Sequence, residues 1–191
     1  MILFPHMTNN FMSQNNTVSW SKDYFLDWLD FQAESNPAVF EDVHSTIKYR
    51  YTWTVNSDSI GNQIRFFIEN IDLTAEFYPL LSWVRQPQAT SQLLKHEQGH
   101  FDFAELLRSE ITEQIQNVFN GKKFPTRGQN SEQQKQFARE DSNLLIANEI
   151  EKWEKYLFEK QAEYDKQTNY GQIIETQQEY DIMFKKLRNT L

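Results

Sequence analysis

Two histidines and a glutamate stand close together in the segment LLKHEQGHFDFAEL, residues 93–106. His96 and His100 are four residues apart, so on an α-helix both side chains lie on one face and can reach the same ion. Glu97 lies on a neighbouring edge of that face, where it can take a proton from metal-activated water. The spacing therefore predicts a Zn²⁺ site with Glu97 as its catalytic base.

A third protein ligand has to come from outside this segment, because catalytic zinc usually has three protein ligands and a water molecule. At 100° per residue, Asp102 lies about 160° and Glu105 about 140° from His100 around the helix, so neither can face the same ion. We expect Glu105 to pair with Arg108 instead. The remaining candidates by residue type are His44, the helical acids Glu140, Glu149 and Glu163, and the segment from Asp165 to Tyr170.

Alternating residues before the motif predict a small antiparallel sheet. In IKYRYTWTV, residues 47–55, every second side chain is apolar, as in a half-buried strand. NSDSIGN is rich in turn residues, and QIRFFIE and IDLTAEF then predict two more strands. PLLSWV is a candidate for a fourth strand.

The pattern then changes to one of helices. The histidines and the apolar residues around them recur at intervals of three and four, which predicts a helix of about 30 residues. Thr90 or Ser91 can cap its start, and Gly121 is expected to end it. Two further helices are expected over residues 131–166 and 173–187.

Strands followed by helices predict an α+β domain. We expect a small antiparallel sheet packed against the long HExxH helix and two further C-terminal helices. Residues 1–20 are predicted to form a loose N-terminal arm and residues 21–191 a single domain. Within that domain, strands should dominate residues 21–88 and helices residues 89–191.

Composition and charge exclude several classes of partner. The 191 residues contain 19 Lys and Arg against 27 Asp and Glu, a formal net charge of −8. Nucleic acids and anionic membranes bind clustered Lys and Arg, whereas here the basic residues are scattered. We also expect no signal peptide and no membrane-spanning helix, because long apolar runs are lacking. The chain has no cysteine, which excludes disulfide bonds and thiolate chemistry.

Three segments resemble a bacterial family of domains of unknown function, number 922 in its series. SWV followed by LLKHEQGHFDFAELLR resembles the core of the family, LDWLDFQAE its opening Trp-x-Asp-Phe motif, and YDKQTNYGQIIETQQEYD its closing segment. The resemblance extends from about Leu26 to Tyr180. Members are described as secreted or periplasmic zinc-dependent proteases, so the resemblance implies zinc peptidase chemistry on a peptide or protein substrate at such a location.

The resemblance also implies a third zinc ligand. The family has His before the Gly of its closing segment, whereas this chain has Tyr170 before Gly171. A neutral phenol is a weak ligand unless the ion makes it ionise. If Tyr170 does not bind the metal, Asp165 or Glu163 must replace it.

Two functions follow from these patterns. The first is a zinc metallopeptidase in which Glu97 activates water and Tyr170 binds the ion or stabilises the oxyanion. The alternative is a catalytically degenerate, metal-binding or metal-free adaptor that binds a protein partner through its acidic helical surface. Tyr170 in place of the expected His motivates the adaptor, and retention of Glu97 argues against it.

Overall fold

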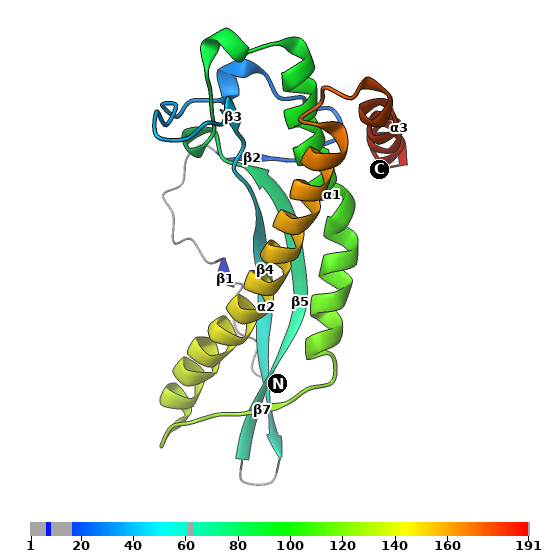
Figure 1. Cartoon of the computed structure of the whole chain (residues 1–191). Coiled ribbons are helices and arrows are strands. Elements are labelled where there is room, and N and C mark those ends of the chain that lie inside the picture. The colour runs from blue at the N-terminus through cyan, green and yellow to red at the C-terminus, as the bar shows by residue number, and fades with distance from the viewer. Residues whose placement is uncertain (1–6, 9–16, 61–62, 191) are drawn as a thin grey trace. The chain divides into compact units, whose positions relative to one another are not determined.

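The structure is a computed structural model that describes residues 7–8, 17–60 and 63–190. Its main sheet has two long central strands, β4 (Ile47–Ile60) and β5 (Gln63–Phe77), which lie side by side (Figure 1). Short strands continue the sheet on either side: β1 (Met7–Thr8) pairs with β4, and β2 (Val18–Ser19) and β7 (Phe124–Pro125) pair with β5.

β5 is one strand where the sequence predicts two, because its buried side chains change from even to odd residue numbers partway along the strand. Phe66 and Ile68 are buried on even positions, and Ile71 and Leu73 on odd positions. Asn70 lies between them with a left-handed φ of 52°, a conformation that Asn tolerates better than most residues. The additional residue keeps the apolar side chains on the buried face, so the prediction of separate strands is wrong.

The turn predicted over NSDSIGN is also mostly strand, because β4 continues through Ile60. Asn56 is buried, and its amide nitrogen donates to Glu69 Oε2 at 2.8 Å. Its Oδ1 atom has no hydrogen-bond partner among the described residues. PLLSWV does not add a strand to the main sheet. It forms a 3₁₀ turn, η2 (Pro79–Leu81), and the two-residue strand β6 (Trp83–Val84), which pairs with β3 (Val43–His44).

As the sequence predicts, three helices make up most of the chain after β6: α1 (Ser91–Phe119), α2 (Ser131–Thr168) and α3 (Ile174–Thr190), with the short strand β7 between α1 and α2. Thr90 caps α1, since its Oγ1 accepts a hydrogen bond from the Leu93 amide at 3.1 Å. Gly121 follows the end of α1 with a φ of 68°, as the C-terminal signal predicts. The structure confirms the α+β class, with a helix packed against an antiparallel sheet and two C-terminal helices.

The described residues fall into two compact units. The first contains residues 7–8, 51–60, 63–73 and 109–155. The second contains residues 17–50, 74–108 and 156–190. The single domain predicted for residues 21–191 stays a prediction, and most of the predicted arm, residues 1–6 and 9–16, lies outside the described residues.

Aromatic packing and a buried hydrogen bond hold the start of α1 to the sheet in the second unit. The ring centroids of Phe77 on β5 and Phe101 on α1 are 6.1 Å apart, and both residues are fully buried. The Tyr49 hydroxyl donates to the Ala104 carbonyl at 2.6 Å. Among the described residues, no helix combines the length and the apolar character needed to cross a membrane.

A buried ion pair fixes the other side of α1. Asp102 pairs with Arg188 of α3, and their side chains are only 5% and 9% exposed. Asp102 Oδ1 also accepts hydrogen bonds from Trp20 Nε1 at 2.8 Å and from Gln98 Nε2 at 2.9 Å. Arg188 in turn donates to three backbone carbonyls, those of Ser21, Lys22 and Tyr24. The carboxylate that the sequence places on the back of the helix thus has its own structural role.

Asp102→Ala should lower the free energy of unfolding by about 3 kcal/mol, because it leaves the Arg188 guanidinium buried without its counter-ion. Urea unfolding followed by circular dichroism measures the change. Glu163→Ala is the matched control, since it removes a half-exposed carboxylate from an i, i+3 pair with Lys160 and should have little effect. Equal losses in the two variants would contradict the assignment.

Candidate metal centre

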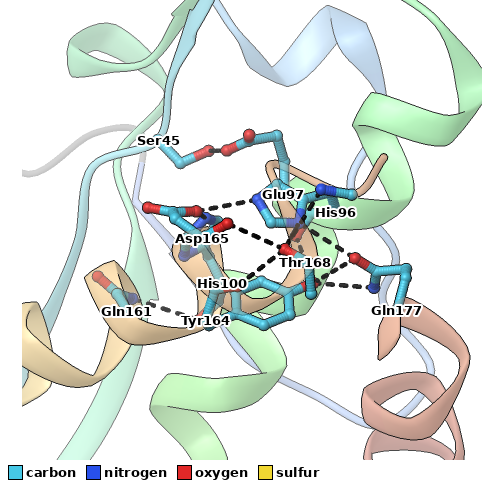
Figure 2. Close-up of polar contacts among 10 residues, drawn as sticks. Ser45, His96, Glu97, His100, Gln161, Tyr164, Asp165, Thr168 and Gln177 are labelled. Atoms are coloured by element: carbon cyan, nitrogen blue, oxygen red, sulfur yellow. Dashed lines mark hydrogen bonds and ion pairs between the residues drawn. The ribbon is translucent and has the colours of Figure 1, made fainter. Parts of the chain in front are cut away.

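Helices α1 and α2 bring three possible metal ligands together in the second unit (Figure 2). His96 and His100 lie on α1, and Asp165 lies near the end of α2. Asp165 Oδ1 is 3.0 Å from His96 Nε2 and 2.9 Å from His100 Nε2. The three ligand atoms all lie within 4.8 Å of one another. His96 is fully buried and His100 nearly so, whereas Asp165 is about a quarter exposed.

The structure places Tyr170 differently. The residue is 61% exposed, and its ring centroid is 6.5 Å from that of His96. It has a left-handed φ of 54°, and Gly171 follows with a φ of 78°. A Cβ atom on Gly171 would lie 2.9 Å from His96 Cβ, so glycine allows the backbone to pass directly beside the histidine. This geometry favours Asp165 over Tyr170 as the third ligand.

The other candidate ligands have different neighbours. His44 Nδ1 is 3.9 Å from Glu41, and the His44 ring stacks on Trp83 with centroids 6.2 Å apart. Three helical acids contact a residue on their own helix: Glu140 with Gln136, Glu149 with Lys152 and Glu163 with Lys160. Glu105 pairs with Arg108 at 2.9 Å, as predicted. Among the described residues, only His96, His100 and Asp165 form a group of metal-ligating side chains.

A chain of polar contacts sets the tautomer of His96. Gln177 Nε2 donates to Asp181 Oδ1 at 3.0 Å, and Asp181 pairs with Lys95. Because a carboxylate only accepts, this bond directs the amide oxygen of Gln177 towards His96 Nδ1, which is 3.1 Å away. Nδ1 therefore carries the hydrogen, and Nε2 presents the lone pair that a metal ligand needs.

This tautomer makes a cation necessary at the centre. His96 Nε2 and Asp165 Oδ1 are both acceptors and lie 3.0 Å apart, so they repel unless a proton or a metal ion lies between them. His100 Nε2 approaches the same oxygen. Two imidazole nitrogens and one carboxylate oxygen form a donor set that suits zinc and leaves a fourth position for water or substrate. The residues present therefore fit the ion that the motif predicts.

Glu97 lies beside this group with its carboxylate directed towards Ser45 (Figure 2). It is 4% exposed, and its Oε2 accepts a hydrogen bond from Ser45 Oγ at 2.5 Å. Ser45 lies between β3 and β4, so the segment that leads into β4 holds the Glu97 side chain. Within the described part of the chain, Glu97 forms no ion pair with Lys or Arg. Its carboxylate thus has no basic side chain as a counter-ion there.

The Tyr164 ring packs against the rings of both histidines. Tyr164 is fully buried, and its ring lies nearly parallel to that of His96, with centroids 4.6 Å apart and an interplanar angle of 15°. Its hydroxyl contacts Gln177, and burial raises the pKa of that hydroxyl above its ordinary value. A Cβ atom at position 99 would lie 2.1 Å from the Tyr164 hydroxyl oxygen, which explains the glycine in the HEQGH motif.

Charge coupling in the metal-free centre shifts two pKa values. Burial lowers the pKa of His100, but the hydrogen bond to Asp165 and the charges of Glu97 and Asp165 outweigh it, so this pKa lies above the ordinary 6.5. Burial raises the pKa of Asp165, but the hydrogen bond from His100 and the positive charge of that imidazolium outweigh it and hold this pKa well below the ordinary 3.8. The metal-free centre therefore favours an imidazolium and a carboxylate.

The residue pattern alone does not single out Ser45, Tyr164 or Gln177. Each contacts the α1 histidines or Glu97 across more than 50 residues of sequence, and such contacts leave no periodic signal. The closing segment that resembles family 922 contains Tyr164, Asp165 and Gln177. This resemblance is the feature of the sequence that points to Tyr164 and Gln177. Protein-family models, curated proteins and solved structures were compared with the chain, and none matches it. The family resemblance therefore stays an expectation.

Gly99→Ala should lower the free energy of unfolding by about 2 kcal/mol, because the added methyl group displaces Tyr164 from its position under His96. Chemical unfolding measures the loss. Ser109→Ala, at an exposed position of the same helix, is the control and should be neutral. Adding Tyr164→Phe removes the clashing oxygen and should restore part of the loss. A Gly99→Ala variant as stable as wild type would contradict the close packing of Gly99 against Tyr164.

The pair of His100 and Asp165 should make the stability of the metal-free chain depend on pH. The raised pKa of His100 contributes stability that is complete below 6.5 and is lost as the pH rises through the folded-state value. The lowered pKa of Asp165 contributes stability that is complete above 3.8 and is lost at lower pH. Asp165→Asn should therefore destabilise the chain more at about pH 5.5 than at about pH 9. Urea titrations with chelator test this, and equal losses would contradict it.

Proposed function

We propose that this chain is a zinc-dependent metallopeptidase whose ion binds to His96, His100 and Asp165 and whose general base is Glu97. The observation that carries the proposal is the convergence of both Nε2 atoms on Asp165 Oδ1, at 3.0 and 2.9 Å. Neighbouring side chains orient the His96 ring so that its lone pair faces this point. The family resemblance is the basis for two further parts of the proposal: peptides as the substrate class, and a periplasmic or secreted location.

The donor set supports zinc more than the harder divalent cations. Magnesium and calcium prefer shells of oxygen ligands, whereas two imidazole nitrogens with one carboxylate oxygen suit zinc. The histidines are buried and Asp165 is about a quarter exposed, so the open side of the centre is the side of the carboxylate. A substrate carbonyl group would approach from there.

The residues of the chain divide the chemistry between them. A bound zinc ion would supply a Lewis acid that polarises the scissile carbonyl group and makes water acidic near neutral pH. Glu97 takes a proton from the attacking water and then gives it to the leaving nitrogen. Ser45 donates to one oxygen of Glu97, which leaves the other oxygen for the proton. Gln177 keeps the hydrogen of His96 on Nδ1 throughout.

The adaptor alternative loses its motivation when the third ligand is Asp165. It rests on the replacement of the family's His by Tyr170, which would remove a metal ligand. Asp165 supplies the missing donor atom from the same segment, five residues earlier. A buried glutamate at position 97 also has no use in a purely structural metal site.

Zinc affinity measured with a competing chromophoric chelator tests the ligand set. Wild type should bind one zinc ion per chain, and His100→Ala and Asp165→Ala should each weaken binding by roughly a hundredfold or more. Tyr170→Phe is the matched control, because it removes only an exposed hydroxyl group, and its affinity should equal that of wild type. Loss of zinc in Tyr170→Phe with retention in Asp165→Ala would instead place the third ligand at Tyr170.

Peptide hydrolysis by Glu97→Gln separates the base from the ligands. This variant should keep zinc and lose roughly a thousandfold in kcat, because a general base contributes on the order of 10²–10⁴. Full activity in Glu97→Gln would refute the assigned role of Glu97. A wild-type chain that takes up no zinc, even when zinc is offered in excess, would overturn the metallopeptidase and favour the metal-free adaptor.

A further inference from the structure

A pocket of about 470 Å³ lies within the second unit and is lined by residues from segments that also contribute to the candidate metal centre. Leu93 lines it and lies one helical turn before Glu97 on α1. Val43 of β3 also lines it, two residues before the Ser45 that binds Glu97. Tyr170 forms a third wall, with its ring centroid 6.5 Å from that of His96. Three of the segments that line the pocket therefore also carry a side chain of the candidate centre or one that contacts it.

The lining combines apolar walls with negative charge. Phe40, Val43, Leu93 and Tyr170 supply the apolar surface, and Phe40 is fully exposed to solvent. Two carboxylates, Glu41 and Asp42, line the same pocket. Its other lining residues are Gln88, Thr90, Gln92 and Gln172, so all described residues around this pocket are apolar, neutral or acidic.

The negative charge is only partly compensated. Arg85 lies 3.7 Å from Asp42, but its guanidinium also donates to the carbonyls of Asn36 and Val39 and so holds the loop in place. Glu41 is 63% exposed, and its contact with His44 Nδ1 at 3.9 Å is too long for a hydrogen bond. A cation entering the pocket would therefore meet one exposed carboxylate and one that is shared with Arg85.

We propose that this pocket is a specificity subsite that binds a Lys or Arg side chain of the peptide substrate. The aliphatic stem of such a residue would pack on the apolar walls, and its charged end would reach Glu41 and Asp42. A neutral apolar side chain would cover the Glu41 carboxylate without giving it a partner, and an acidic one would be repelled. The subsite rests on the proposed peptidase function, because it assumes that a peptide lies across the centre.

Two peptide libraries test the subsite. Both contain blocked, fluorescein-labelled decapeptides of random neutral sequence, with lysine at the central position in one and norleucine in the other. Fluorescence anisotropy measures their binding to metal-free chain, and cleavage is measured on the zinc-loaded chain. The variant Glu41→Gln/Asp42→Asn removes the pocket charge. The control, Asp23→Asn/Glu179→Gln, removes the same charge from exposed positions outside the pocket.

Wild type should bind and cleave the lysine library about fivefold better than the norleucine library. Glu41→Gln/Asp42→Asn should lose this preference, whereas the control variant should keep it. Glu41→Gln alone should lose part of this preference. Because this single variant keeps Asp42, the partner of Arg85, it tests the subsite even if the double variant misfolds. Equal affinity of wild type for both libraries, or a preference that survives in the double pocket variant, would overturn the subsite. A chain that selects lysine peptides without cleaving them would support the pocket while refuting the peptidase.

Discussion

One carboxylate oxygen facing two imidazole nitrogens is the constraint on which the site depends. Asp165 Oδ1 lies about 3 Å from the Nε2 atoms of His96 and His100, and an acceptor group of this kind is stable only around a cation. In the metal-free chain that cation is a proton, which explains the raised pKa of His100 and the lowered pKa of Asp165. A metal ion would replace the proton without a change in the identity of the donors. Protonation and metal binding therefore compete for the same position.

Each of the three helices has a distinct part in holding this arrangement. α1 supplies the imidazoles and Glu97, α2 supplies Asp165 and the Tyr164 ring that packs under His96, and α3 supplies Gln177. The amide of Gln177 is useful only because Asp181, one turn later on α3, fixes its orientation. Lys95 of α1 pairs with Asp181, so the contacts form a closed path from α1 through α3 and back to the histidine. The tautomer of His96 thus depends on residues that do not contact the metal position.

The sequence predicts the features that depend on local spacing and leaves open those that depend on long-range contact. His96, Glu97 and His100 could be assigned to one face of a helix because that face repeats every three to four residues, and α1 has the predicted bounds. Asp165 remained one of several candidates, because it meets His96 across 69 residues of sequence. Asn70 misled the strand prediction, since an additional residue in a strand shifts the alternation in the same way as a break between two strands does. The family resemblance pointed to Tyr170, where the backbone passes His96 but the side chain is largely exposed.

The ion pair of Asp102 with Arg188 gives the centre a rigidity that does not come from the metal. Asp102 and His100 lie on different sides of α1, so the buried contacts of Asp102 fix the rotation of the helix about its own axis. This rotation directs both histidines towards Asp165. In small zinc domains that fold around their metal, part of the binding free energy is used to order the chain. Here the contacts of Asp102 do not involve the candidate ligands, so loss of an ion bound at the candidate centre would leave this part of the fold in place.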